Sequence, residues 1–130
     1  LLVAAAAVAA KSPEWFMGSF SARAADAAAA AAGPDGRLFA MSSYADWLLW
    51  ARPELRGRVA FDARYELLDA QQVATIGRFQ SRAGNWQRAI AGYSVVVLSK
   101  QHDEAIASAL LRSGALRKAA VDGDMIVLRR

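Results

Sequence analysis

The stretch SVVVL at residues 94–98 decides the fold class of this chain. Four consecutive apolar residues leave no alternate position for a solvent-facing polar side chain, and this pattern is typical of a strand that is covered on both faces. Such strands occur mainly in parallel sheets, where helices connect one strand to the next. The stretch therefore predicts helical segments before and after it.

Helical patterns flank this strand on both sides. A helix is predicted over residues 103–113, and Gly114 is expected to end it. Upstream, Asp69 and Gln72 have the spacing of a capping box, which predicts the start of another helix. Apolar residues at helical spacing predict a further helical segment over residues 86–93.

Two more strands are predicted closer to the N-terminus, at residues 37–41 and 58–62. Between them, residues 44–52 have a helical pattern. The spacing of Ser43 and Asp46 predicts a capping box at the start of that helix. Strands and helices therefore alternate through most of the chain.

The last part of the chain has a different pattern. Asp122-Gly123 lies between two strand-like runs, which predicts a β-hairpin. Strands joined by helices imply right-handed crossovers and parallel pairing. We therefore predict an α/β fold: a three-layer sandwich with a small, mainly parallel sheet in a flavodoxin/Rossmann-like layout, ending in an antiparallel β-hairpin. With 130 residues in all, residues 12–130 should form one domain.

Residues 1–11 have a composition unlike the rest. The sequence LLVAAAAVAA is entirely apolar and Lys11 follows it. Ten residues cannot cross a bilayer, which needs about 20. The segment is interpreted first as the end of a transmembrane helix. The end of a signal peptide, with Ala7-Val8-Ala9 as the cleavage pattern, and an ordinary buried helix are the alternatives. A helix capped by Ser12 is expected to run from there to Ala32.

Composition limits the chemistry. The chain has no cysteine and one histidine, so disulfides are excluded and a metal site is not expected. The net charge is +4, but the basic residues form no run of five, so no nucleic-acid partner is expected. No phosphate-binding glycine motif follows a strand. We therefore expect no cofactor.

Polar side chains follow three of the predicted strands. In an open parallel sheet, ligands bind at the carboxyl ends of the strands, so these side chains form the candidate binding site. They belong to Ser42, Ser43, Asp62, Arg64, Ser99 and Lys100. The alternative for Asp62 and Arg64 is structural: the two side chains would pair within the turn and hold the loop that follows.

Four segments of this sequence resemble a known family. They are GPDGRLFAMSSYADWLLW (33–50), ELRGRVAFDARYELL (54–68), AGYSVVVLSK (91–100) and DGDMIVLRR (122–130). The chain resembles the C-terminal extracytoplasmic domain of bacterial multi-spanning membrane proteins related to C-type, dolichyl-phosphate-mannose-mannosyltransferase-like glycosyltransferases. The turn Phe61-Asp62-Ala63-Arg64 departs from that family, which usually has glycine at the position of Ala63.

The resemblance implies a location and a role. The domain would lie on the extracytoplasmic face of a bacterial plasma membrane, joined to a membrane-embedded N-terminal part of the same protein. Because the family's catalytic carboxylates lie in that part, the resemblance implies no catalytic residue here. It implies an accessory domain that helps shape an acceptor or lipid-linked sugar site, with the membrane surface or the lipid-linked sugar as partner. The rival hypotheses are a stand-alone flavodoxin-like binding module for a small anionic ligand, and a soluble enzyme.

Overall fold

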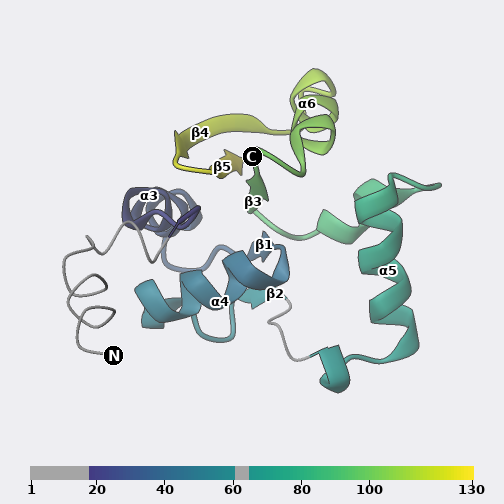
Figure 1. Cartoon of the computed structure of the whole chain (residues 1–130), viewed down its shortest axis with the longest axis horizontal. Coiled ribbons are helices and arrows are strands. Elements are labelled where there is room, and N and C mark those ends of the chain that lie inside the picture. The colour runs from purple at the N-terminus through teal and green to yellow at the C-terminus, as the bar shows by residue number, and fades with distance from the viewer. Residues whose placement is uncertain (1–17, 61–64) are drawn as a thin grey trace, which may run out of the picture.

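The computed structural model describes residues 18–60 and 65–130. Within them, five strands form one open sheet in the order β2-β1-β3-β5-β4 (Figure 1). The strands are β1 (Leu38–Ala40), β2 (Val59–Ala60), β3 (Val95–Ser99), β4 (Arg117–Asp122) and β5 (Met125–Arg129). The predicted apolar segment at 1–11, the first part (12–17) of the helix predicted from Ser12 to Ala32, and the turn at 61–64 lie outside the described residues.

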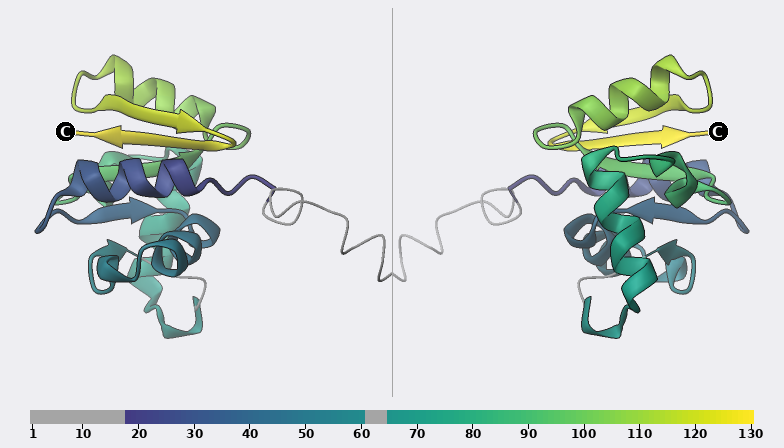
Figure 2. Two further views of the ribbon diagram at one scale, coloured as in Figure 1. Left: turned by 90° about the vertical axis from the view of Figure 1, so that its left-hand side faces the viewer. Right: turned by 90° about the vertical axis from the view of Figure 1, so that its right-hand side faces the viewer.

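The sheet is parallel at one end and antiparallel at the other. Strand β1 pairs in parallel with both β2 and β3. Strand β5 pairs antiparallel with β3 on one side and with β4 on the other, so the predicted C-terminal hairpin is confirmed (Figure 2). Gly123 has a φ of 58° in its turn, a conformation that glycine adopts without steric cost. The chain is thus a mixed α/β fold.

Helices connect the strands. They are α3 (Ala22–Ala32), α4 (Ser42–Ala51), α5 (Ala70–Ser81) and α6 (Glu104–Arg112), with short 3₁₀ turns η1 (Pro53–Leu55), η2 (Tyr65–Leu67) and η3 (Trp86–Ile90). In Figure 1, α3 and α4 lie on one side of the strands and α5 and α6 on the other. Within residues 18–60 and 65–130, no helix combines the length and the apolar composition that a bilayer-spanning helix needs.

Alternate strand residues contribute to two separate core clusters, because successive side chains of a strand point to opposite faces. The first cluster combines α3 and α4 with Leu38, Ala40, Val95, Val97, Met125 and Val127. The second combines α5, η3 and α6 with Phe39, Val96, Leu98, Ile126 and Leu128. All five residues of β3 are buried, as the apolar run at 94–98 predicts.

The prediction for the first helix is wrong at its start. Instead of running through from Ser12, helix α3 begins at Ala22, and Gly18 and Ser19 form a turn. Gly18 has a φ of 53°, which no right-handed helix contains. Ser21 caps α3 in place of Ser12: its Oγ accepts a hydrogen bond of 3.0 Å from the N–H of Ala24.

The capping predictions have different outcomes. The box at Asp69 and Gln72 is confirmed, with each side chain bonded to the other residue's N–H at 2.8 and 2.9 Å. The box at Ser43 and Asp46 is wrong, because α4 starts directly after β1 and Met41 is its N-cap, without a side-chain cap. The predicted helical segment at 86–93 is a 3₁₀ helix that covers only Trp86–Ile90.

Candidate functional site

Polar side chains gather where β3 ends and where the β4–β5 turn returns to it. Because Ser99 pairs with Met125, the residue before Met125 lies beside the carboxyl end of β3. The first turn of α4 reaches the same edge from β1. We call this group the strand-end cluster, and it consists of Tyr44, Ser99, Gln101, Asp103 and Asp124.

Asp124 is at the centre of the strand-end cluster. Its Oδ2 accepts hydrogen bonds from the Tyr44 hydroxyl at 2.5 Å and from the Ser99 hydroxyl at 2.6 Å. Its Oδ1 accepts the N–H of Gln101 at 2.7 Å. Ser99 Oγ in turn accepts the N–H of His102 at 3.0 Å. Both carboxylate oxygens therefore have short, charge-assisted partners, which are the stronger kind of hydrogen bond.

These contacts move the pKa values of the acidic groups in different directions. Burial by itself would raise the pKa of the Asp124 carboxyl, but its hydrogen bonds, led by the one from Ser99, outweigh burial and hold this pKa below its ordinary value. Burial, and then the bond to Asp124, raises the pKa of the Tyr44 hydroxyl far above its ordinary value. Burial also raises the pKa of Asp103, although the N–H of Ser99 donates to it at 2.8 Å.

The arrangement determines what the strand-end cluster can do. A general acid or base needs a proton that can reach a substrate and a pKa near the working pH. Here the hydroxyl of Tyr44 stays protonated and donates to Asp124, which stays ionised. The donors and acceptors thus satisfy one another, and they fix α4, β3 and the hairpin turn to each other.

The incoming chain is fastened at the same edge. The N–H of Asp124 donates to the carbonyl of Ser19 at 3.4 Å, and the hydroxyl of Ser21 donates to the Asp122 carboxylate. The indole Nε1–H of Trp47 donates to the carbonyl of Ser21 at 3.0 Å. The chain therefore enters the described domain beside the strand-end cluster.

An open hollow of about 440 Å³ adjoins this point of entry. Its lining includes one cation, Lys100, and two carboxylates, those of Glu104 and Asp124. Amides and a hydroxyl complete it, from Gly18, Ser19, Gln101 and Gly123. Because negative groups outnumber the positive one, the hollow does not concentrate positive charge for an anion.

The predicted site residues are only partly brought together. Lys100 lies at the strand-end edge and is exposed, as is Ser43 in the first turn of α4. Ser42 begins α4, so its backbone is at this edge too. Asp62 and Arg64 lie outside the described residues, so both hypotheses about them stay open.

Sequence reasoning missed Asp124 and Tyr44, which hold the site together. One signal could have indicated Asp124. The predicted hairpin at Asp122-Gly123 must return a strand beside 94–98, and an antiparallel neighbour begins where its partner ends. The residue after the turn would then lie at the carboxyl end of that strand.

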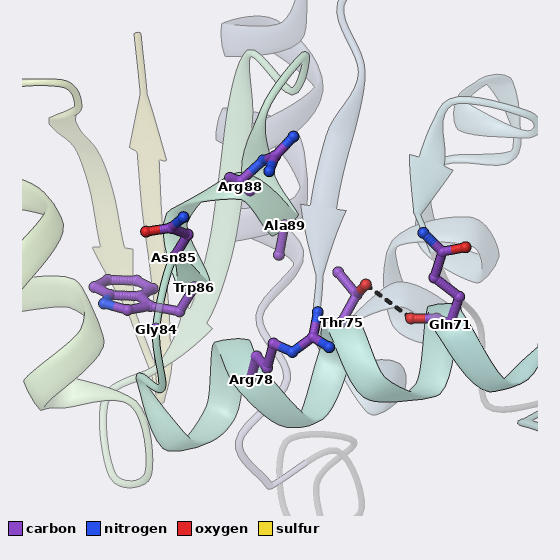
Figure 3. A pocket seen from close by; sticks show the side chains of 8 residues that line it. All are labelled: Gln71, Thr75, Arg78, Gly84, Asn85, Trp86, Arg88 and Ala89. Atoms are coloured by element: carbon purple, nitrogen blue, oxygen red, sulfur yellow. Dashed lines mark hydrogen bonds between the residues drawn. The ribbon is translucent and has the colours of Figure 1, made fainter.

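A second hollow, also of about 440 Å³, lies between α5 and η3 and shares no lining residue with the first (Figure 3). It is lined by Gln71, Thr75, Arg78, Gly84, Asn85, Trp86, Arg88 and Ala89. No sequence pattern indicated it, because its two walls are separated by a turn with a φ of 53° at Arg82 and 56° at Gly84. We call it the arginine hollow.

No family model, curated protein or solved structure matches this chain. A functional assignment therefore depends on the residues themselves and on the segments quoted above.

Proposed function

We propose that this chain is a non-catalytic, extracytoplasmic accessory domain of a polytopic membrane glycosyltransferase-like protein in a bacterial plasma membrane. The observation that carries the proposal is the contact between Ser19 and Asp124, where the carbonyl of one meets the N–H of the other at 3.4 Å. It ties the entry of the chain to the edge of the sheet where ligands of open α/β sheets bind.

The short stretch of chain between Lys11 and Gly18 limits how far the strand-end edge can lie from a membrane. Lys11, which ends the apolar segment, and Gly18 are seven positions apart. Even a fully extended chain of that length spans at most about 25 Å. If residues 1–11 end a membrane helix of the parent protein, the strand-end edge stays within that distance of the bilayer surface. A lipid-linked sugar or its acceptor would then be within reach of the domain.

The hollow at this edge suits a hydroxyl-rich ligand. The carboxylate of Glu104 can accept from sugar hydroxyls, and the ammonium of Lys100 can donate to them. Its volume of about 440 Å³ falls within the usual range for small-molecule sites, roughly 300–1,000 Å³. The mixture of signs supports a neutral sugar group here. It disfavours the rival hypothesis of an anionic ligand at Ser42, Ser43 and Lys100.

For the fold we propose the three-layer, flavodoxin/Rossmann-like layout. The order β2-β1-β3 of the parallel strands supports it, because the flavodoxin-like order also begins 2-1-3. The two core clusters on alternate strand residues support it as well. The antiparallel β5 and β4 extend that layout at the side of β3.

The absence of cysteine from this sequence permits a direct test. In the full-length parent, with any cysteine outside residues 1–130 replaced by serine, a cysteine at exposed Ala115 should react with a membrane-impermeant maleimide in intact cells. The protein should also stay in the pellet on carbonate extraction. A cysteine at buried Ala28 is the matched control and should react only after unfolding. Labelling of the Ala115 position only after permeabilisation, or release by carbonate, would refute the proposal.

A further inference from the structure

We propose that the arginine hollow binds the phosphate group of a small phosphate ester or diphosphate through Arg78 and Arg88. This site is separate from the strand-end edge, and the inference does not depend on membrane attachment. Arg78 lies in the last turn of α5 and Arg88 in the last turn of η3, so two different elements supply the two cations.

Both charged side chains that line the arginine hollow are positive. Its lining contains two guanidinium groups and no carboxylate. No ion pair within residues 18–60 and 65–130 involves Arg78 or Arg88; the pairs found there all belong to Arg52. Both arginine side chains are exposed, so each can turn toward a dianion in the hollow and bind it by charge-assisted hydrogen bonds.

One neutral donor group, the side-chain amide of Asn85, accompanies the two cations. Figure 3 shows Arg78 and Thr75 on the α5 side of the hollow and Ala89 on the η3 side, with Asn85 and Arg88 on the same segment as Ala89. The Thr75 hydroxyl is not available as a donor, because it already donates to the carbonyl of Gln71 at 2.8 Å. The side-chain amide of Asn85 makes no hydrogen bond to a described residue, so its N–H groups are free for oxyanion oxygens.

The walls of the hollow are fixed by the aromatic core rather than by the arginines. Trp86 is buried and packs edge-on against Phe79, with ring centroids 5.6 Å apart. Phe79 in turn packs on Phe39 of β1 at 4.7 Å. Because these contacts hold η3 against α5 without a ligand, binding would require ordering only of the two arginine side chains, which lowers its entropic cost.

Shape and size define the chemical class of the ligand. Guanidinium groups bind phosphate oxygens in pairs of parallel hydrogen bonds, and two of them match a doubly charged phosphate better than a singly charged carboxylate. The hollow of about 440 Å³ exceeds what one phosphate fills. The ligand should therefore carry a further group beyond the phosphate.

The test uses the full 130-residue chain and NMR titration with inorganic pyrophosphate and with a soluble sugar phosphate. We expect shifts of the backbone amide of Thr75 and of the side-chain amide of Asn85, saturating with ligand. Arg78→Gln and Arg88→Gln should each weaken binding at least about tenfold. Arg112→Gln is the matched control, because Arg112 is also exposed in the last turn of a helix, and it should leave binding unchanged.

The same chain with vesicles containing phosphatidic acid distinguishes the source of the phosphate. Retention on vesicles that depends on Arg78, without shifts from the soluble esters, would assign a lipid headgroup; shifts from the soluble esters would assign a free ligand. The proposal is overturned if sodium chloride at equal ionic strength gives the same shifts, if no probe produces any, or if the Arg78→Gln/Arg88→Gln double variant, shown by thermal unfolding to be folded, binds like the wild type.

Discussion

The hydroxyl of Tyr44 donates a hydrogen bond of 2.5 Å to the carboxylate of Asp124, which lies 80 positions later in the chain. This bond joins the first turn of α4 to the turn of the C-terminal hairpin, and Ser99 at the end of β3 donates to the same oxygen. The parallel and antiparallel ends of the sheet are thereby held together at one edge. We expect the hydrogen bonds to Asp124 to contribute strongly to the stability of the fold. The first three predictions concern the strand-end cluster.

Replacing Asp124 with alanine should be strongly destabilising. It removes an acceptor used by three donors, one of which is the hydroxyl of buried Tyr44. We expect a loss of about 2–4 kcal/mol in the free energy of unfolding and a fall in melting temperature of about 10 °C or more. Asp35→Ala, in an exposed turn, is the control and should change stability by less than about 0.5 kcal/mol. Equal effects of the two substitutions would contradict this prediction.

Tyr44→Phe isolates the hydroxyl, because the ring keeps its edge-on contact with Phe20 at 5.7 Å. Urea unfolding should show a loss of about 1–2 kcal/mol. Since Tyr44 and Ser99 donate to the same oxygen of Asp124, the effects of Tyr44→Phe and Ser99→Ala should not be additive. Strict additivity in this double-mutant cycle would show that the two donors act independently.

Asp103 and Asp124 should affect the pH dependence of stability in opposite directions. Asp103 has a raised pKa in the fold, so its contribution is complete below the ordinary value of 3.8 and is lost as pH rises through the folded pKa. Asp124 has a lowered pKa, so its contribution is present above 3.8 and is lost as pH falls through the folded pKa.

Melting temperatures measured across acidic pH test this difference. Relative to the wild type, Asp103→Asn should become more stable as pH rises, whereas Asp124→Asn should become less stable. If the melting temperatures of the two variants followed the same pH profile, the pKa values of Asp103 and Asp124 would not be shifted in opposite directions.

Two glycines, one between α3 and β1 and one in α5, should respond in opposite ways to replacement by alanine. A Cβ at Gly36 would overlap the carbonyl oxygen of Ala32 and lie 2.5 Å from Ser94 Oγ, so Gly36→Ala should destabilise by roughly 2 kcal/mol or more. A Cβ at Gly77, in the middle of α5, would meet nothing, so Gly77→Ala should stabilise by about 0.5–1 kcal/mol. Thermal unfolding measures both, and the same sign for both substitutions would contradict the described packing.

Local signals in the sequence were enough for most strands and for some helix ends. The apolar run at 94–98 predicts a strand buried on both faces, which β3 is, and Asp122-Gly123 predicts the hairpin turn. The capping box at Asp69 depends on residues three positions apart, so it could also be predicted. The start of α3 could not, because Ser21 is fixed as its cap partly by contacts to Trp47 and Asp122.

The functional surfaces were harder to predict because they depend on contacts between distant segments. Nothing near Tyr44 in the sequence indicates Asp124, and only the strand order brings them together. Lys100 was correctly placed at the strand-end edge, since it directly follows β3, but its carboxylate neighbour Asp124 comes from the hairpin turn. The arginine hollow likewise depends on the reversal of the chain at Arg82, a positive φ that no local pattern predicts.

The central claim is that the strand-end cluster stabilises a non-catalytic domain, and turnover of a lipid-linked sugar by the purified chain tests it most directly. The assay compares the wild type with Asp124→Asn, and thermal unfolding confirms that both are folded. We predict no turnover by either protein, because Asp124 and the Tyr44 proton are committed to each other. Turnover by the wild type that Asp124→Asn abolishes would contradict the account.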